Sequence, residues 1–236
     1  MLPVAVLAGG LGTRVAHRTG PAVPKALLEI AGVPFIDLKL AELAESGVDE
    51  VCMLVGHAAG PLVEYVGDGV DHGLRVTWLE DRPSLLGTGG AVARFAGQLF
   101  GPFWLTYGDT LLEVPMVTIE EQFLSDDALL GMTVLENADR WERSNVTVEG
   151  GRVVTYEKDA PAGSHRYIDY GMSIWRPAAF EDAPKPPFDL GDIVRSLTAS
   201  RRVSAHPVTR RFYDIGNDRS IEETTRFVVE HRRRFL

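Results

Sequence analysis

The chain of 236 residues has little cysteine, no long apolar run and no surplus of positive charge. Its one cysteine, Cys52, excludes an intrachain disulfide and a zinc site built from several cysteines. No run approaches the ~18 apolar residues of a membrane-spanning helix, and Met1-Leu2-Pro3 lacks the basic start of a secretory signal. The formal charge of −9 argues against a nucleic-acid partner. We therefore expect a cytoplasmic protein that binds neither membrane nor nucleic acid.

Apolar runs alternate with helical patterns in the first half of the chain, which is typical of a doubly wound α/β fold. We expect strands at 3–8, 50–55, 74–79 and 102–107 and helices at 35–46, 58–66 and 88–97. Beyond residue 125 the pattern predicts closely spaced strands at 129–135, 144–149, 152–157 and 168–175, then helices at 190–199 and 218–234. Glu149-Gly150-Gly151-Arg152 indicates a hairpin turn.

These elements predict one domain, 1–236, with a three-layer, doubly wound mixed sheet and a small antiparallel part. We expect about 1–125 to form one half and about 126–236 the other. In such sheets ligands bind beyond the carboxyl ends of the strands, so the residues that follow each strand are candidate site residues.

A glycine-rich loop follows the first apolar run. Gly9-Gly10-Leu11-Gly12-Thr13-Arg14 comes directly after Leu2 to Ala8, and Pro24-Lys25 follows shortly after. Glycines let several backbone N–H groups converge on an anion, and Arg14 and Lys25 add positive charge. The pattern therefore predicts a cradle for phosphates, most simply a triphosphate.

Two other phosphate-binding motifs are excluded. The nucleoside-triphosphate P-loop ends in Gly-Lys-Ser/Thr, and the chain has no Gly-Lys pair. The dinucleotide fingerprint G-x-G-x-x-G fails because Val15 stands where its third glycine belongs. For the three glycines alone, a strand-to-helix turn without a ligand is the alternative.

The full string Gly-Gly-x-Gly-Thr-Arg followed by Pro-Lys resembles the signature of the sugar-1-phosphate nucleotidyltransferases, also called nucleotide-sugar pyrophosphorylases. The resemblance runs from Leu7 to Asp214-Ile-Gly and implies a Rossmann-like nucleotidyltransferase fold. It also implies a nucleoside triphosphate and a sugar 1-phosphate as binding partners. In this loop the implied nucleotide-binding residues are Leu7, Ala8, Gly9, Gly10, Gly12, Thr13 and Arg14.

A second glycine-rich turn, Leu86-Gly87-Thr88-Gly89-Gly90, follows the expected strand at 74–79. From the residues alone, Thr88 is expected to cap a helix that starts at Gly89. In the resembled family this loop lies against the nucleobase and the sugar. The resemblance therefore implies that Gly87, Thr88 and Gly89 contact the nucleotide.

Two carboxylates are candidate Mg²⁺ ligands. Asp109 directly follows the strand at 102–107, and Mg²⁺ binds one or two carboxylates together with phosphate oxygens. An aspartate that only serves a turn is the alternative. Asp214-Ile215-Gly216 resembles the family motif that brings a second metal ligand beside the first, which makes Asp109 and Asp214 the implied Mg²⁺ ligands.

The second half is expected to bind the sugar phosphate. Glu157-Lys158 matches the family's Glu-Lys motif, in which the acid takes sugar hydroxyls and the lysine neutralises phosphate, and Gly171 matches the glycine of Asn-x-Gly. Asp169 replaces the usual asparagine of that motif, and Asn145 lies where Tyr-Gly-Val is frequent. We expect Asn145 and Asp169 beside the sugar ring.

The implied reaction needs positioning and charge neutralisation and no general base, because the attacking phosphate is already an anion. Arg14, Lys25 and Asp109 are the expected catalytic residues. The six histidines form no metal-ligand spacing such as H-E-x-x-H.

The length fits the short family members, and Leu-Gly-Thr-Gly-Gly is closest to the guanylyltransferase types. We expect GTP and a mannose- or heptose-type sugar 1-phosphate. UTP, dTTP and CTP stay open, as does a regulatory paralogue that binds these ligands without turnover. A homo-oligomer is one option for the assembly.

Overall fold

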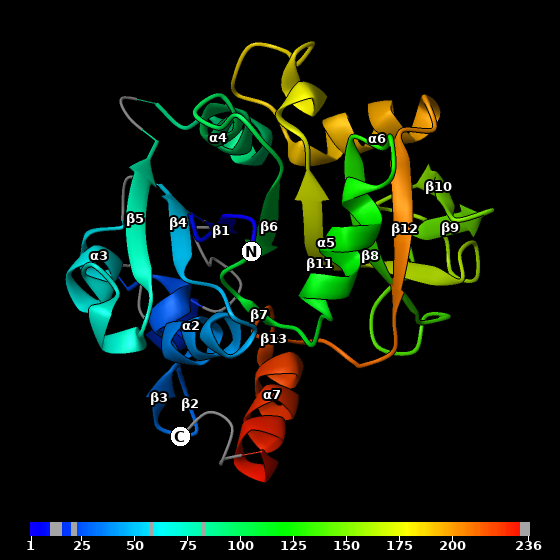
Figure 1. The fold of residues 1–236 in the computed structure, drawn as a ribbon. Helices are drawn as coiled ribbons and strands as arrows, with labels where there is room; N and C mark the ends of the chain where they lie inside the picture. The colour runs from blue at the N-terminus through cyan, green and yellow to red at the C-terminus, as the bar shows by residue number, and fades with distance from the viewer. Residues whose placement is uncertain (10–15, 20–22, 57–58, 82–83, 232–236) are drawn as a thin grey trace.

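The computed structural model describes residues 1–9, 16–19, 23–56, 59–81 and 84–231. Within these residues the centre of the fold is a nine-stranded mixed sheet with the order β5-β4-β1-β6-β11-β8-β12-β10-β9 (Figure 1). In chain order its strands are β1 (Val4–Leu7), β4 (Glu50–Val55), β5 (Arg75–Glu80), β6 (Phe103–Tyr107), β8 (Leu130–Glu136), β9 (Val146–Glu149), β10 (Arg152–Tyr156), β11 (Tyr167–Trp175) and β12 (Val203–Val208).

Helices and two small ribbons surround this sheet. The ribbons pair β2 (Glu29–Ile30) with β3 (Val33–Pro34), and β7 (Thr110–Leu111) with β13 (Tyr213–Asp214). The α-helices are α1 (Ala16–Thr19), α2 (Phe35–Glu45), α3 (Gly60–Val66), α4 (Gly87–Ala96), α5 (Met116–Leu124), α6 (Leu190–Ala199) and α7 (Asp218–Glu230). The 3-10 helices are η2 (Lys25–Leu27), η3 (Val70–His72) and η4 (Pro177–Phe180).

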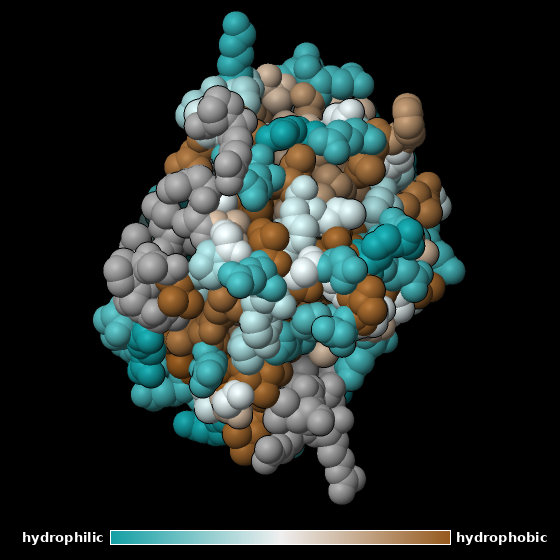
Figure 2. Space-filling model, turned by 90° about the vertical axis from the view of Figure 1, so that its left-hand side faces the viewer, coloured by the Kyte–Doolittle hydropathy of each residue, from teal (hydrophilic) through white to brown (hydrophobic). Residues whose placement is uncertain are grey.

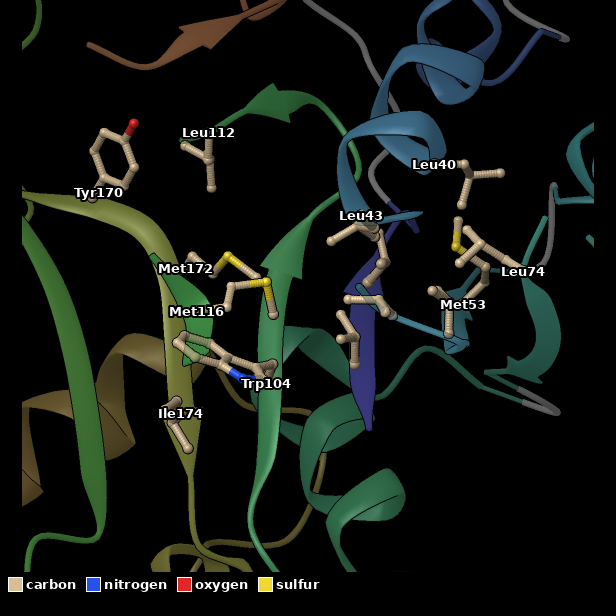
Figure 3. Close-up of a cluster of buried hydrophobic side chains, with 14 of the residues drawn as sticks. Leu40, Leu43, Met53, Leu74, Trp104, Leu112, Met116, Tyr170, Met172 and Ile174 are labelled. Atoms are coloured by element: carbon tan, nitrogen blue, oxygen red, sulfur yellow. The ribbon is translucent and has the colours of Figure 1, made fainter. Parts of the chain in front are cut away.

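The first four strands of the sheet, β5, β4, β1 and β6, are parallel, as the sequence predicts, and lie within one residue of the expected bounds. Their apolar side chains alternate between the two faces of the sheet. Val4 and Val6 belong to one buried cluster, with α2, α3 and α5, whereas Ala5 belongs to another, with α4 and α6. Figure 3 shows part of the first cluster. This three-layer, mixed α/β arrangement confirms the predicted fold class.

The strands of the second half continue the same sheet. β11 runs antiparallel to β6 and β8, whereas β12 runs parallel to β8. β10 and β9 follow as an antiparallel hairpin whose turn, Gly150-Gly151, has positive φ at both residues, so the predicted hairpin is confirmed. β9, the last strand in the order, also pairs with β11 through Val146 and Tyr167. The second half, which was expected to be antiparallel or mixed, is therefore mixed, and the β9–β10 hairpin is its antiparallel part.

The sequence reasoning missed α5 and β12. Met116, Ile119 and Phe123 are the buried residues of α5, and their helical spacing is a signal that predicts such a helix. β12 is harder to predict, because it contains Pro207 and polar residues that become buried, such as His206. The expected helix starts at 58 and 88 are corrected to Gly60 and Gly87, and the stretch 232–234 of the last expected helix lies outside the described residues.

On the face shown in Figure 2, hydrophobic and hydrophilic side chains lie interspersed. Among the residues that the structure describes, no helix combines the length and apolar character needed to cross a membrane.

Candidate active site

A cavity of about 280 Å³ lies at the carboxyl ends of the parallel strands. We call it the α4 cavity, because Gly87, Thr88 and Ala91 of α4 line it together with residues at the ends of β1, β4 and β6. Leu7 and Gly9 line it, and Ala8 donates its backbone N–H to Leu54 O at 2.9 Å. A Cβ at Gly9 would lie 2.9 Å from the Gly56 nitrogen, so only glycine lets β1 and β4 end this close together.

The remaining residues of the predicted phosphate cradle, Gly10, Gly12, Thr13 and Arg14, lie outside the described residues. Their assignment stays a prediction. Lys25, the other cation expected here, lies at the start of η2 and is described.

Lys25 and Asp109 meet at the edge of the α4 cavity. Lys25 Nζ donates to Asp109 Oδ2 at 2.7 Å, although 84 residues separate them in sequence. The Lys25 side chain is mostly buried, whereas that of Asp109 is 42% exposed. The carboxylate is therefore open to a ligand from the cavity side.

Asp214 is brought near Asp109 through the backbone. β13 pairs with β7 so that Asp214 lies opposite Thr110, and Ile215 N donates to Asp109 O at 3.2 Å. The Asp214 side chain, however, accepts from the Gly216 N–H at 2.7 Å and lines a separate cavity with Trp141 and Arg211. The structure thus brings the two strands together but does not turn both carboxylates into the α4 cavity.

Of the two carboxylates, Asp109 alone lines the α4 cavity, and it offers the kind of hard oxygen ligand that Mg²⁺ prefers together with phosphate oxygens and water. Within the described part of the chain, no group of three or more His, Cys, Asp or Glu side chains gathers into a metal site. An arrangement of this kind needs oxygen atoms from a phosphate substrate to complete a metal site.

The second glycine-rich turn packs against the segment before α6. Gly87 has φ +73, and a Cβ there would lie 2.4 Å from Phe188 O; a Cβ at Gly89 would meet the Phe188 ring at 2.4 Å. Gly89 N donates to Phe188 O, and Phe188 N donates to Leu86 O. Gly87 lines the α4 cavity, but Gly89 does not. The contact with Phe188 thus explains why both positions require glycine.

Thr88 joins the two segments by its side chain. Its hydroxyl accepts from Leu190 N at 2.9 Å and lies 3.5 Å from Asp189 Oδ2, to which it donates. The expectation that Thr88 caps a helix starting at Gly89 is therefore wrong: α4 begins at Gly87, and no side chain caps it. The Thr88 hydroxyl instead forms hydrogen bonds with Asp189 and Leu190.

A second cavity, of about 110 Å³, adjoins the first and shares Thr88 and Tyr107 with it. We call it the α6 cavity, because Asp189, Leu190, Gly191 and Val194 line it at the start of α6. Three residues predicted for the sugar phosphate also line it: Lys158, Asp169 and Gly171. We treat these two adjoining cavities as one candidate site, because they share Thr88 and Tyr107.

Lys158 is held by Asp189, a residue that the sequence reasoning missed. Lys158 Nζ lies 2.6 Å from Asp189 Oδ1, which also accepts from Gly191 N and caps α6. Partial burial raises the pKa of Asp189, but the hydrogen bonds from Lys158 and the Gly191 N–H outweigh it and hold the pKa below its usual range. Asp189 is therefore ionised at neutral pH.

Asp169 lies at a register shift of β11 against β8. Its Oδ1 accepts from Gly171 N at 3.0 Å, and its own N–H donates to Asn145 Oδ1 at 2.9 Å. Burial raises the pKa of Asp169 above its usual range, and the Gly171 N–H and the charge of Lys158 offset this only in part. Asp169 is thus a carboxylate for which ionisation costs free energy.

Tyr107, which both cavities share, was also missed. Burial raises its pKa above the ordinary range, and the charges of Asp169 and Asp109 raise it further. The hydroxyl therefore stays protonated at neutral pH and can donate a hydrogen bond. Its position at the carboxyl end of β6, two residues before Asp109, is the signal that could have identified it.

Glu157 and Asn145 do not line the α6 cavity. Glu157 Oε2 lies 3.4 Å from the buried His165 Nε2, and its backbone N–H donates to Asn145 O. The Asn145 side chain instead accepts a hydrogen bond from the backbone N–H of Asp169. The assignment of both residues to the sugar stays a prediction.

Comparisons with known proteins show which family the chain resembles. Residues 4–118 match the MobA-like NTP transferase domain. Agl11 of Haloferax volcanii, a low-salt glycan biosynthesis nucleotidyltransferase, is 27% identical over 96% of this chain and 66% of its own length. The mannose-1-phosphate guanylyltransferase of Mycobacterium tuberculosis is 38% identical, over 40% of this chain and 26% of its own length. The chain is a homologue of the sugar-1-phosphate nucleotidyltransferases.

The resemblance to the sugar-1-phosphate nucleotidyltransferases predicted from the sequence is thereby confirmed. This homologue spans two thirds or less of the length of those two relatives. By contrast, the N-acetylmuramate alpha-1-phosphate uridylyltransferase of Neisseria meningitidis serogroup B is 24% identical over 89% of the chain and 91% of its own length. The crystal structure of HddC from Yersinia pseudotuberculosis complexed with GMP-PN has a TM-score of 0.79 at 23% identity and covers 96% of the chain and 99% of its own, which shows a shared fold.

The raised pKa of Asp169 leads to a prediction for stability. The folded state holds this proton more tightly than the unfolded chain, so stability falls as pH rises from the ordinary carboxyl pKa of ~3.9 through the raised folded-state pKa. Asp169→Asn removes the charge and keeps an oxygen for the Gly171 N–H. We expect a higher melting temperature at pH 7, where each 1 kcal/mol corresponds to about 2–4 °C for a chain of this size.

Differential scanning calorimetry of both proteins from pH 4 to pH 8 measures this effect. The gain should grow with pH through the acidic range and be smallest at pH 4. A variant that melts below the wild type at pH 7 contradicts the prediction.

Proposed function

We propose that the chain transfers a nucleotidyl group from a nucleoside triphosphate to a sugar 1-phosphate, giving a nucleotide sugar and pyrophosphate. The observation that carries this proposal is the pair of adjoining cavities that share Thr88 and Tyr107, with Lys25 and Asp109 at one and Lys158 at the other. We assign the nucleotide to the α4 cavity, in residues 1–125, and the sugar phosphate to the α6 cavity, mostly in residues 126–236. The family match supports the reaction class.

In the proposed reaction a phosphate oxygen of the sugar 1-phosphate attacks the α-phosphorus. The bond from that phosphorus to the oxygen bridging to the β-phosphate breaks, and pyrophosphate leaves with the bonding electrons. Lys158 neutralises the incoming phosphate, and Lys25 neutralises charge near the α-phosphate. Arg14 is assigned to the leaving β,γ-phosphates. No proton has to move, so the residues act by positioning and by charge.

Asp109 and Asp214 are the residues assigned to Mg²⁺. When bound, the ion would draw charge from the α-phosphate and hold the nucleophile near it. The exposed carboxylate of Asp109, with Lys25 beside it, supports this assignment.

For the donor we propose GTP. The Leu86-Gly87-Thr88-Gly89-Gly90 turn and a structural neighbour crystallised with GMP-PN support it. UTP is the second candidate, because a relative that matches the chain over nearly its whole length is a uridylyltransferase.

For the acceptor we propose a mannose- or heptose-type sugar 1-phosphate. Asp169 in the α6 cavity supports selection by hydroxyl configuration, since a buried acceptor left unpaired by the wrong sugar costs free energy. Such sites can reject an analogue by ~10⁴-fold or more in favourable cases.

A matrix of GTP, UTP, dTTP and CTP against glucose, mannose, heptose and N-acetylmuramate 1-phosphates, read by pyrophosphate release, tests the proposal. Glucose 1-phosphate should be a poor acceptor with GTP, and Asp169→Asn should narrow the gap. Turnover with none of these pairs, together with retained ligand binding, would point to the regulatory paralogue instead.

The ion pair between Lys158 and Asp189 predicts the effect of Asp189→Ser. Serine caps a helix about as well as aspartate but carries no charge to compete with phosphate for Lys158. Because both side chains are about half exposed, the pair is worth about 0.2–1 kcal/mol. We expect the KM for the sugar phosphate to fall by about 1.5- to 5-fold, with little change in melting temperature.

Asp192→Ser is the matched control, because Asp192 lies in the same first turn of α6 and pairs with Arg195. It should leave the KM unchanged. A rise in KM for Asp189→Ser would show that Asp189 holds Lys158 in place for the substrate instead of competing with it.

A further inference from the structure

α2 contains a buried ion pair that the proposed reaction does not use. Lys39 Nζ donates to Glu42 Oε1 at 2.7 Å, and the two side chains are 0% and 3% exposed. From the sequence, both residues fit the polar positions of a surface helix. In the fold they lie within the helix layer, on the side that meets the segment after β7.

Stability alone does not account for such a pair. Removing two charges from water costs several kcal/mol for each ion, and apolar residues of similar volume often replace a buried pair without loss. The helix around it is already well packed, with Leu38, Leu40 and Leu43 fully or almost fully buried. The other hydrogen bonds of this pair therefore indicate what it does.

Glu42 binds the backbone that leads from Asp109. Its second carboxylate oxygen, Oε2, accepts from Leu112 N at 2.6 Å, three residues after Asp109. The next amide, Glu113 N, donates to the hydroxyl of Tyr170 on β11 at 3.1 Å. Leu112, Tyr170 and the α2 residue Leu43 belong to one buried cluster (Figure 3). Side chains from α2 and β11 thus fix two consecutive N–H groups of this segment.

The same segment directly follows Asp109 and pairs with the strand that carries Asp214, the other candidate metal ligand. Thr110 and Leu111 form β7, which pairs with β13 and Asp214. A shift of β7 would therefore move Asp109 relative to Lys25 and move Asp214 with it. Displacements of about 1 Å caused far from the reacting atoms can cost ~10²-fold in rate.

We propose that Lys39 and Glu42 are positioning residues for Asp109. Lys39 fixes the Glu42 carboxylate, and Glu42 fixes the Leu112 N–H and hence β7. The inference rests on the proposed function only for the role of Asp109.

Two matched double variants test it. Lys39→Met/Glu42→Gln removes both charges but keeps an oxygen that accepts from Leu112 N. Lys39→Met/Glu42→Met has nearly the same shape and removes the acceptor as well. The readouts are kcat, the KM for each substrate, the melting temperature, and the affinity for Mn²⁺ measured by electron paramagnetic resonance, with Asp109→Asn as the reference.

We expect the Gln variant to keep kcat within about threefold, and the Met variant to lose about 10- to 100-fold in kcat with both KM values nearly unchanged. Mn²⁺ affinity should fall about tenfold in the Met variant alone, at a melting temperature close to that of the Gln variant. Equal kcat and equal Mn²⁺ affinity in the two variants, or an equal loss in both, overturns the proposal.

Tyr170→Phe tests the same anchoring if the Met variant does not fold, because it keeps the ring in the core and removes the hydroxyl that accepts from Glu113 N. It should lower kcat and Mn²⁺ affinity in the same direction; unchanged values overturn the proposal. A wild type that binds Mn²⁺ through Asp109 but releases no pyrophosphate with any substrate pair refutes the proposed function, and the Mn²⁺ comparison still decides the positioning role.

Discussion

Asp109→Asn is expected to lower the rate of pyrophosphate release by at least about 100-fold and to leave the fold intact. The substitution removes a charge at the site of reaction, where losing a single group that stabilises developing charge typically costs about 10²–10³ in kcat. The side chain is 42% exposed, and asparagine keeps an oxygen for the Lys25 ammonium, so the melting temperature should change little.

Pyrophosphate release with Mg²⁺, and again after chelation by EDTA, measures this effect. Asp127→Asn is the control, because its side chain is 80% exposed and pairs with Arg152 away from both cavities. Near-normal turnover in the Asp109 variant, or wild-type activity that survives EDTA, removes the support for the metal assignment.

Arg14→Ala should lower kcat by about 10²–10³ while the KM for the sugar phosphate changes little. A guanidinium directed at the leaving pyrophosphate acts where charge develops, so its loss raises the barrier more than it weakens acceptor binding. Steady-state kinetics with each substrate varied in turn separates the two effects.

Arg18→Ala is the control for the loss of an arginine four residues later in the sequence, because Arg18 Nε pairs with Asp218 Oδ1 on α7 at 2.5 Å. That variant should keep kcat within a few fold. If Arg14→Ala changes only the KM for the sugar phosphate, Arg14 belongs to the other end of the site.

The sequence predicts the parallel half of the sheet well, because β1, β4 and β6 are buried on both faces and stand out as continuous apolar runs. Strands are harder to predict from the sequence where contacts with distant parts of the chain determine whether they form. β7 and β13 have two residues each, and each is a strand only because the other lies beside it. Pro207 argues against a strand at β12, yet the strand forms between β8 and β10.

The candidate site divides in the same way. The rule that ligands bind beyond strand ends identified Gly9 and Asp109, which line the α4 cavity. Asp189 was missed because it precedes a helix, where aspartate is common as a cap, and its ion pair with Lys158 arises only in the fold. Glu157 and Lys158 were both expected to bind the sugar phosphate, and of the two only Lys158 lines the α6 cavity. Both residues follow the end of β10 at Tyr156, and the motif alone does not fix which of the two side chains faces the cavity.

The late position of β12 in the chain has a consequence for synthesis. This strand lies between β8 and β10, although both of these precede it by many residues. While the ribosome is still adding residues before Val203, β8 and β10 have exposed edges where β12 will later pair, and exposed edges can pair with other chains. A product that stops before Val203 lacks the strand that joins these edges. We therefore expect such truncated chains to aggregate, whereas chains extended through Val208 can complete the sheet.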